Sequence, residues 1–221
     1  MVIAIDGTSS SGKTSIAREL SKYLDIPMLG TGLIYRAIAL KLYNINIDKN
    51  DDEAIKQILE TTSIRTEYDQ GKCKVFLDGL EAPDFVLHAP HISVYTPTIA
   101  TNPIIREFVK NIQRQEAENH VNLIVEGRDI GSVVFPDADF KFYIDADIKT
   151  RAERRLQDYI SQGKNLTLEE VIKEIERRDD QDRNREISPL IMTSDAHLID
   201  SSSMPISKCV ELMADIINKN N

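Results

Sequence analysis

Short apolar runs alternate along the chain with longer segments in which apolar residues recur at helical spacing. The short runs are typical of buried strands and lie at 2–5, 26–29, 123–125, 140–144 and 196–199. The longer segments predict amphipathic helices, one beginning near Ile16 and others at 33–43, 51–60 and 104–118. Strands that alternate with helices favour an α/β fold with a parallel, doubly wound sheet.

One region departs from this pattern, because apolar and polar residues alternate within it. The alternation covers 64–68 and 72–77, and Asp69-Gln70-Gly71 between them is typical of a turn. A period of two predicts an antiparallel hairpin rather than another helix. We therefore expect a small antiparallel β insertion over about residues 63–87.

The first apolar run leads into a glycine-rich loop that matches a phosphate-binding motif. Gly7 through Thr14 fit G-x-x-x-x-G-K-[ST] without a gap, with a strand pattern before and a helix pattern after. The expected ATP-binding residues are Gly7, Thr8, Ser9, Ser10, Ser11, Gly12, Lys13, Thr14 and Ser15. Lys13 would reach the β- and γ-phosphates, and the Thr14 hydroxyl would hold Mg²⁺. The alternative, a chance Gly/Ser turn with one lysine, is disfavoured by this strand–loop–helix context.

A second charged feature follows a predicted capping box at Thr167 and Glu170. Apolar residues mark the buried face of the predicted helix; they are Leu168, Val171, Ile172 and Ile175. By helical spacing the same face continues into Arg178, Asp182 and Arg185. Charge on an inward face needs a ligand or a partner charge. The alternative is a solvated helix end with local ion pairs.

Composition and charge narrow the choice of ligand. The chain has 221 residues, 41% hydrophobic and 29% charged, which is ordinary for a soluble domain with an insertion. The net charge of −9 disfavours a nucleic acid or an anionic membrane as partner. Seven of the thirteen arginines nevertheless lie between Arg151 and Arg185. This concentration of guanidinium groups indicates a small anionic ligand.

Other signals are weak. The two cysteines are far apart and give no disulfide framework or metal spacing, and the four histidines form no ligand or triad pattern. No secretory signal or membrane span is recognisable, so we expect a cytosolic protein, and a monomer.

A nucleoside triphosphate in the loop suggests phosphoryl transfer, which depends on positioning and charge neutralisation. A phosphate acceptor is already deprotonated, so it needs cations rather than a general base. Arg36, Arg128, Arg178 and Arg185 supply planar forks that bind phosphate oxygens in pairs. These residue types predict a nucleoside monophosphate kinase, without indicating the base.

Three stretches carry a resemblance to bacterial cytidylate kinases that runs nearly end to end. They are GTGLIYR at 30–36, EGRDIGSVVFPDA at 126–138 and ERRDDQDRNR at 176–185. The resemblance implies one P-loop kinase domain with a five-stranded parallel sheet flanked by helices. It further implies a monophosphate-binding insertion at about 31–103, a short helical lid at about 151–167, and transfer of phosphoryl from MgATP to CMP or dCMP.

The resemblance also implies residue roles. Lys13, Arg36, Arg128 and Arg185 would be catalytic, the three arginines by holding the acceptor phosphate. Arg178 and Asp182 would contact the pentose, while Arg106 and Asp129 would read cytosine. The full set expected to bind CMP is Thr31, Tyr35, Arg36, Arg106, Arg128, Asp129, Arg178, Asp182 and Arg185. Arg154 would bind ATP from the lid together with Arg151 and Arg155, for which surface ion pairs are the alternative.

Two positions depart from the family pattern. Gly30 stands where these kinases usually have an acid, and Pro97 falls where they place a small hydroxyl residue beside the base. Proline has no donor to offer there. Two rival functions stay open: a kinase of another small acceptor, and a nucleotide-binding regulator without turnover. No N-K-x-D guanine reader is present for a GTP switch.

Overall fold

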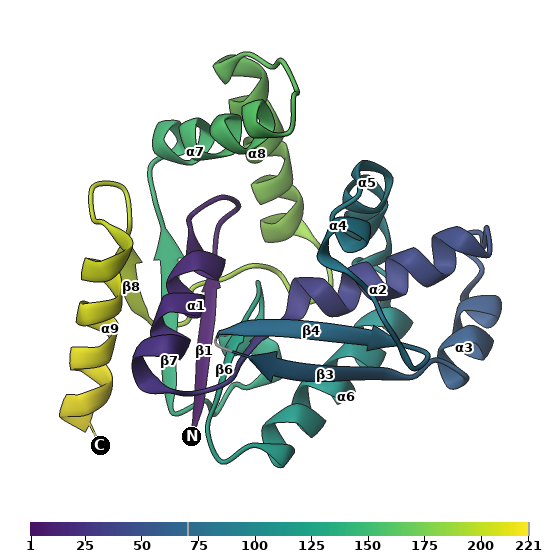
Figure 1. Cartoon of the computed structure of the whole chain (residues 1–221), viewed down its shortest axis with the longest axis horizontal. Coiled ribbons are helices and arrows are strands. Elements are labelled where there is room, and N and C mark those ends of the chain that lie inside the picture. The colour runs from purple at the N-terminus through teal and green to yellow at the C-terminus, as the bar shows by residue number, and fades with distance from the viewer. Residues whose placement is uncertain (70, 221) are drawn as a thin grey trace.

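A computed structural model describes residues 1–69 and 71–220, and its centre is a parallel sheet of five strands in the order β2-β6-β1-β7-β8 (Figure 1). The strands are β1 (Val2–Gly7), β2 (Met28–Gly30), β6 (Leu123–Glu126), β7 (Phe140–Asp145) and β8 (His197–Asp200). The register pairs Ile3 with Ile124 on one side and with Phe140 on the other. The predicted five-stranded parallel sheet is thus confirmed.

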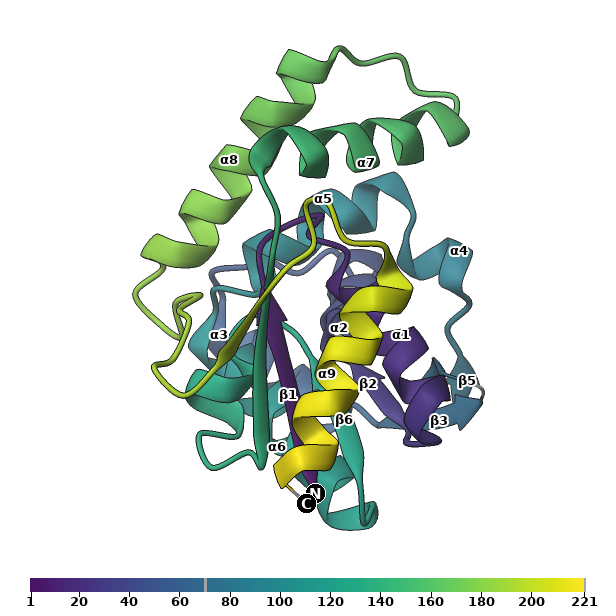
Figure 2. The same ribbon diagram turned by 90° about the vertical axis from the view of Figure 1, so that its left-hand side faces the viewer.

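Helices cover both faces of this sheet. They include α1 (Lys13–Leu24), α2 (Thr31–Asn44), α3 (Asp52–Glu60), α6 (Pro103–Asn119) and α9 (Ile206–Asn220). In β1, Ile3 and Ile5 pack into one core cluster together with residues of α1 and α9, whereas Ala4 packs into another with α2 and α6. Alternate residues of a strand point to opposite faces, so β1 is buried on both. Figure 2 shows α9 lying alongside α1.

The predicted antiparallel insertion is present as a separate three-stranded sheet. It consists of β3 (Ile64–Asp69), β4 (Lys72–Leu77) and β5 (Leu80–Glu81); Gln70 of the expected turn lies outside the described residues. Cys73 and Val75 of β4 join the core cluster beneath α2. Tyr68 donates a hydrogen bond of 2.8 Å to Glu116 on α6, which ties the hairpin to the main domain.

The proline-rich stretch forms two helices that the sequence pattern did not predict. They are α4 (Asp84–Leu87) and α5 (Pro90–Ile99). Pro90 is in the first turn of α5, where a missing N–H costs little, but Pro97 lies inside the helix. Burial of Ile92 and Ile99 against the core compensates for the unfavourable sequence.

Two further helices, α7 (Ile148–Ser161) and α8 (Leu168–Asn184), form an arm beyond the carboxyl ends of the strands (Figure 2). The arm has its own small core, to which Ala152, Tyr159, Val171 and Ile175 contribute. The predicted capping box is present, because Thr167 and Glu170 bond each other's backbone. No helix in the described part of the chain is both long and apolar enough to span a membrane.

Candidate active site

A cavity of about 630 Å³ opens at the carboxyl ends of the strands, between the glycine-rich loop, α2, α5 and α8. Ligands of α/β sheets bind at this edge, and the volume suits a nucleotide-sized molecule. The predicted residues that line it are Ser9, Ser10, Gly12, Lys13, Thr14, Ser15, Thr31, Tyr35, Arg36, Arg106, Arg128, Asp129, Arg178, Asp182 and Arg185. Sequence segments far apart therefore meet at one cavity.

The loop between β1 and α1 has the backbone that a phosphate cradle needs. A Cβ on Gly7 would lie 2.0 Å from the Ile144 carbonyl oxygen, so no other residue fits there. Gly12 has a φ of 85°, in the left-handed region that glycine tolerates. The Lys13 ammonium donates to the Thr8 carbonyl oxygen at 3.2 Å, which holds it over the loop. The cavity is not lined by Gly7, Thr8 or Ser11, which instead support the loop from the side away from the cavity.

Asp179 on α8 fixes the loop from the arm. Its carboxylate accepts a hydrogen bond of 2.9 Å from the Ser9 amide and pairs with the Arg151 guanidinium, which also donates to the Ser9 carbonyl at 3.1 Å. Asp179 is only 2% exposed. Sequence reasoning did not identify this residue, although it lies four positions after Ile175, the last apolar residue of the predicted buried face.

The two other arginines of α7 have different surroundings. Arg154 donates to the Ser11 carbonyl at 3.3 Å and to the Ser201 carbonyl at 2.6 Å, so it lies beside the loop. Arg155 lines the cavity and lies over the Tyr159 ring at 4.4 Å. Arg151 by contrast is buried and paired, which makes it a structural anchor.

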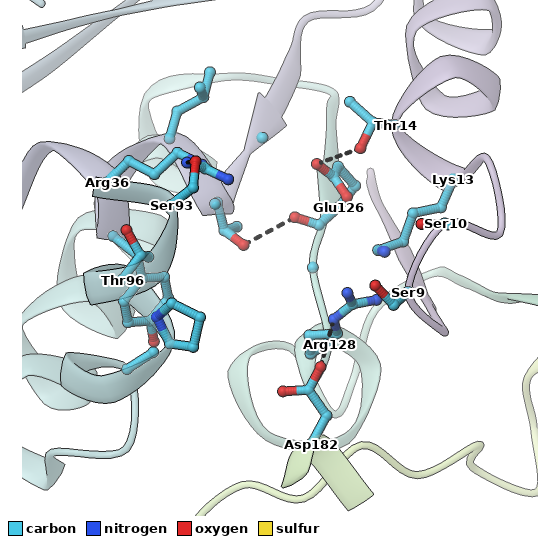
Figure 3. Close-up of a pocket in the computed structure, with 18 of the residues that line it drawn as sticks. Ser9, Ser10, Lys13, Thr14, Arg36, Ser93, Thr96, Glu126, Arg128 and Asp182 are labelled. Carbon is cyan, nitrogen blue, oxygen red and sulfur yellow. Dashed lines mark hydrogen bonds and ion pairs between the residues drawn. The ribbon is translucent and has the colours of Figure 1, made fainter. Parts of the chain in front are cut away.

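Oxygen donors gather where α1 begins and β6 ends. The Thr14 hydroxyl donates to Glu126 Oε1 at 3.2 Å, and Thr31 Oγ1 donates to the Glu126 carbonyl oxygen at 2.9 Å (Figure 3). Glu126 is 7% exposed and directly follows the apolar run at 123–125, and the sequence pattern assigned it no role. A hydroxyl and a carboxylate are hard ligands that Mg²⁺ favours, so this pair fits the ion. At Gly30 a side chain would meet Glu126, since its Cβ would lie 3.5 Å from Oε1.

Cations converge on the middle of the cavity. Arg128 donates to the Gly7 carbonyl oxygen and pairs with Asp182 at 2.9 Å. Figure 3 shows Arg36 on the opposite side of the cavity from Lys13. Arg36 is held there by hydrogen bonds of 2.9 Å to the Leu87 carbonyl and 2.9 Å to the Ser93 hydroxyl. Burial, helped by the nearby cations Arg128 and Arg178 and opposed by Glu126, lowers the pKa of Lys13 to about 7. Such a cluster favours an anion.

The far end of the cavity pairs a guanidinium with a carboxylate. Arg106 contacts Asp129 at 2.5 Å and donates to the Ala100 carbonyl at 2.9 Å. Arg185 lies 3.5 Å from the other carboxylate oxygen of Asp129. The guanidinium carbon of Arg106 lies 5.8 Å from the centroid of the Tyr35 ring. Burial raises the pKa of the Tyr35 hydroxyl to about 12. Acceptor and donor groups thus stand together at a buried edge, as recognition of a polar base requires.

Asp6 holds the segment that carries Arg128 and Asp129. Its carboxylate accepts from the amides of Ile130 at 2.9 Å and Gly131 at 2.8 Å, at the start of the π-helical turn η1 (Ile130–Val134). Burial raises the pKa of Asp6 to about 6, although the two backbone hydrogen bonds oppose the rise. Sequence reasoning missed this residue, because a single aspartate at a strand end carries no pattern of its own.

The sequence was compared with protein families and with known proteins, and the matches cover nearly the whole chain. A family model described as cytidylate kinase matches residues 3–219. A cytidylate kinase of Pediococcus pentosaceus is 40% identical over 215 residues, covering 97% of this chain and 94% of that protein. A cytidylate kinase of Clostridioides difficile is 37% identical over 218 residues, covering 99% of this chain and 98% of that protein.

Solved structures agree with the fold. An uncharacterised protein from Eubacterium ventriosum superposes with a TM-score of 0.56 at 13% identity, covering 99% of this chain and 98% of that one. Shikimate kinase from Bacteroides thetaiotaomicron superposes with a TM-score of 0.51 at 10% identity, covering 99% of this chain and 98% of that one. At such low identity these likenesses show the P-loop kinase fold alone. The near full-length sequence matches show more: the chain belongs to the cytidylate kinase family.

Proposed function

We propose that this protein transfers the γ-phosphoryl group of MgATP to CMP or dCMP, giving ADP and CDP or dCDP. The observation that carries the proposal is one cavity with a phosphate cradle and Lys13 on one side and Arg36 on the other. An Arg106–Asp129 pair at its far end completes an acceptor nucleotide site. Membership of the cytidylate kinase family supports the same substrates.

On the donor side, the loop residues from Gly7 to Ser15 and the Lys13 ammonium bind the phosphates of ATP, and Arg154 supports the loop. Thr14 and Glu126 would hold Mg²⁺, which neutralises phosphate charge when bound. The proposal for Thr14 and Glu126 is supported by their hydrogen bond of 3.2 Å, which brings two oxygen ligands together.

On the acceptor side, Arg36, Arg128 and Arg185 bind the monophosphate. An acceptor phosphate oxygen forms the new bond to Pγ while the bond from Pγ to the bridging oxygen of ADP breaks. No proton has to move, because the acceptor oxygen is already ionised at neutral pH. The residues therefore act by orientation and charge neutralisation.

At the base end, Asp129 accepts from the exocyclic amine of cytosine, and Arg106 donates to a ring oxygen or nitrogen. Uracil would present a carbonyl to Asp129, and two acceptors would then face each other. Thr31, Tyr35 and Asp182 complete the acceptor site. The net charge of −9 suits a monomeric cytosolic enzyme whose partners are nucleotides rather than nucleic acid or a membrane.

A coupled ADP-release assay with MgATP tests the proposal against CMP, dCMP, UMP, AMP and GMP. We expect turnover with CMP and dCMP and much slower turnover with the others. Preferred turnover of a different acceptor would favour the rival kinase function. ADP release independent of any acceptor, or none at all, would rule out the proposed transfer.

A further inference from the structure

Lys141 is a charged residue in the interior of the parallel sheet. It lies on β7, between β1 and β8, and is in register with Ala4. Its side chain is only 8% exposed, and the residues on either side of it, Phe140 and Phe142, are buried as well. Burying an ammonium group costs free energy unless a partner compensates for it. The contacts of Lys141 therefore indicate why a charge is placed there.

The ammonium of Lys141 pairs with a carboxylate on the chain that leads from α8 back to the sheet. Lys141 Nζ lies 2.6 Å from Asp195 Oδ2. Asp195 belongs to the irregular stretch 185–196 between α8 and β8, here called the return segment, which is yellow-green in Figure 2. The hydrogen bond from Lys141 is the largest cause that holds the pKa of Asp195 down at about 2. The pair therefore fastens the return segment to the sheet.

The return segment begins with Arg185, which it holds in place. The Arg185 guanidinium donates to the carbonyl oxygen of Ser188. The amide of Leu190, a residue that is only 3% exposed, donates to the Asp182 carbonyl at 2.8 Å. Arg185 in turn lies 3.5 Å from Asp129 at the far end of the cavity. A return segment that is fastened to the sheet near its end thus limits where Arg185 can lie.

The aliphatic stem of Lys141 supports the other side of the same end of the cavity. A Cβ added to Gly131 would lie 3.2 Å from Lys141 Cδ and 3.3 Å from Cγ, so the stem packs closely against η1. The Gly131 amide also donates to Asp6 at 2.8 Å, and Asp129 directly precedes η1. Lys141 therefore contacts the turn that carries Asp129 with its stem and the return segment with its ammonium.

We propose that Lys141 is a positioning residue of the acceptor site, which sets Asp129 and Arg185 relative to each other. The proposal rests on the proposed kinase function, in which Asp129 reads the base and Arg185 binds the acceptor phosphate. Among the described residues, the cavity lining includes Asp129 and Arg185 but neither Lys141 nor Asp195, so the lysine acts through its neighbours. The binding of CMP should depend on the Lys141–Asp195 pair, whereas the binding of ATP should not.

The test is Lys141→Met, which keeps an unbranched stem against Gly131 but removes the ammonium. Isothermal titration calorimetry gives the Kd for CMP and, in a separate titration, the Kd for ATP. We expect the Kd for CMP to rise about tenfold, the equivalent of one hydrogen bond, with the Kd for ATP unchanged. The melting temperature should not fall, because an apolar side chain in place of a buried charge is often neutral or stabilising.

Lys110→Met is the matched control. Lys110 pairs with Glu107 at 2.5 Å, and Glu107 is as exposed as Asp195, but both residues lie on α6, so their pair joins no separate segments. This variant should bind both nucleotides like the wild type. Asp195→Asn breaks the same pair as Lys141→Met from the other side. The double variant should therefore bind CMP no more weakly than either single variant.

Three results would overturn the positioning role: an unchanged Kd for CMP in Lys141→Met, equal weakening of CMP and ATP, or additive losses in the double variant. Turnover of CMP by the wild type, measured on the same preparation, tests the kinase function separately. An active wild type with normal CMP binding by the variants overturns only the role of Lys141. A wild type that does not phosphorylate CMP overturns both proposals.

Discussion

At the scale of single residues, the buried Arg106–Asp129 pair is the proposed source of base selectivity. Both residues are only 7% exposed, so each needs its partner while no base is bound. A base that enters must replace part of this pairing with hydrogen bonds of its own. A base with the wrong donor pattern would leave a buried group unpaired, and in the proposed function this is the physical origin of discrimination.

The Asp129→Asn variant tests this origin. Asparagine offers a donor as well as an acceptor, so we expect the ratio of kcat/KM for CMP over UMP to narrow, mainly through a gain with UMP. Pro97 cannot supply the hydrogen bond that a hydroxyl residue at this position would give. We therefore expect the wild type to discriminate between CMP and UMP by ~1 kcal/mol less than a site that has the hydroxyl. Steady-state kinetics with both acceptors on both proteins give the answer. Equal use of UMP and CMP by the wild type would mean that Asp129 does not read the base.

The buried carboxyl group of Asp6 leads to a prediction about how the stability of the protein depends on pH. Because its pKa is raised from 3.8 to about 6, the native state takes up a proton before the unfolded chain does as pH falls. This residue therefore costs stability at neutral pH, and the cost disappears between about pH 6 and pH 4. A rise of roughly two units corresponds to about 3 kcal/mol.

The measurement is urea unfolding of the wild type and of Asp6→Asn from pH 4 to pH 7. Asparagine cannot ionise, and it loses one of the two backbone hydrogen bonds at every pH. We therefore expect the unfolding free energy of the wild type to rise relative to the variant as pH falls. A difference between the two proteins that stays constant across this range would refute the raised pKa.

At the scale of elements, the α7–α8 arm is attached to the phosphate cradle by buried charge. Arg151 from α7 and Asp179 from α8 meet at the Ser9 backbone, so one ion pair joins both helices and the loop. Removing one partner of such a pair leaves an uncompensated buried charge. A substitution that breaks this pair should consequently affect both the α7–α8 arm and the loop between β1 and α1.

A double-mutant cycle measures this link. We expect Asp179→Ala to lower the free energy of unfolding by about 3–5 kcal/mol, because Arg151 stays buried without its counter-charge. Adding Arg151→Met should recover part of the loss, since the second charge is then gone as well. Thermal or denaturant unfolding of the single and double variants shows the coupling. Strictly additive effects would mean that the pair does not act as a unit.

Much of this organisation could be predicted from local pattern. The strand–loop–helix at Gly7–Thr14, the alternation in β3 and β4 and the capping box at Thr167 each depend on neighbours in sequence, and each is present. Helix α5 could not be predicted, because tertiary burial of its apolar residues overrides its prolines. Asp179 and Asp6 were missed for a related reason: each serves backbone groups that are far away in sequence.

At the scale of the whole molecule, the cavity lies between two parts that flank the sheet edge. The α7–α8 arm contributes Arg155 and Asp158, and the α4–α5 segment contributes His88 and Ser93 from the other side (Figure 1). Donor and acceptor nucleotides would therefore contact both parts at once. In the proposed function, bringing two anions together in this space depends on the cations that line it, and Lys13 is the cation assigned to the ATP phosphates.

The central claim is that the γ-phosphoryl of ATP becomes the β-phosphoryl of CDP, and an isotope-transfer experiment tests it directly. The protein is incubated with CMP and MgATP labelled in the γ-phosphate, and the products are separated. We expect the label in CDP in the same amount as the ADP formed, with Lys13→Ala folded but slower by several orders of magnitude. Label recovered as inorganic phosphate, label that fails to enter CDP, or a Lys13→Ala protein that transfers normally would contradict this claim.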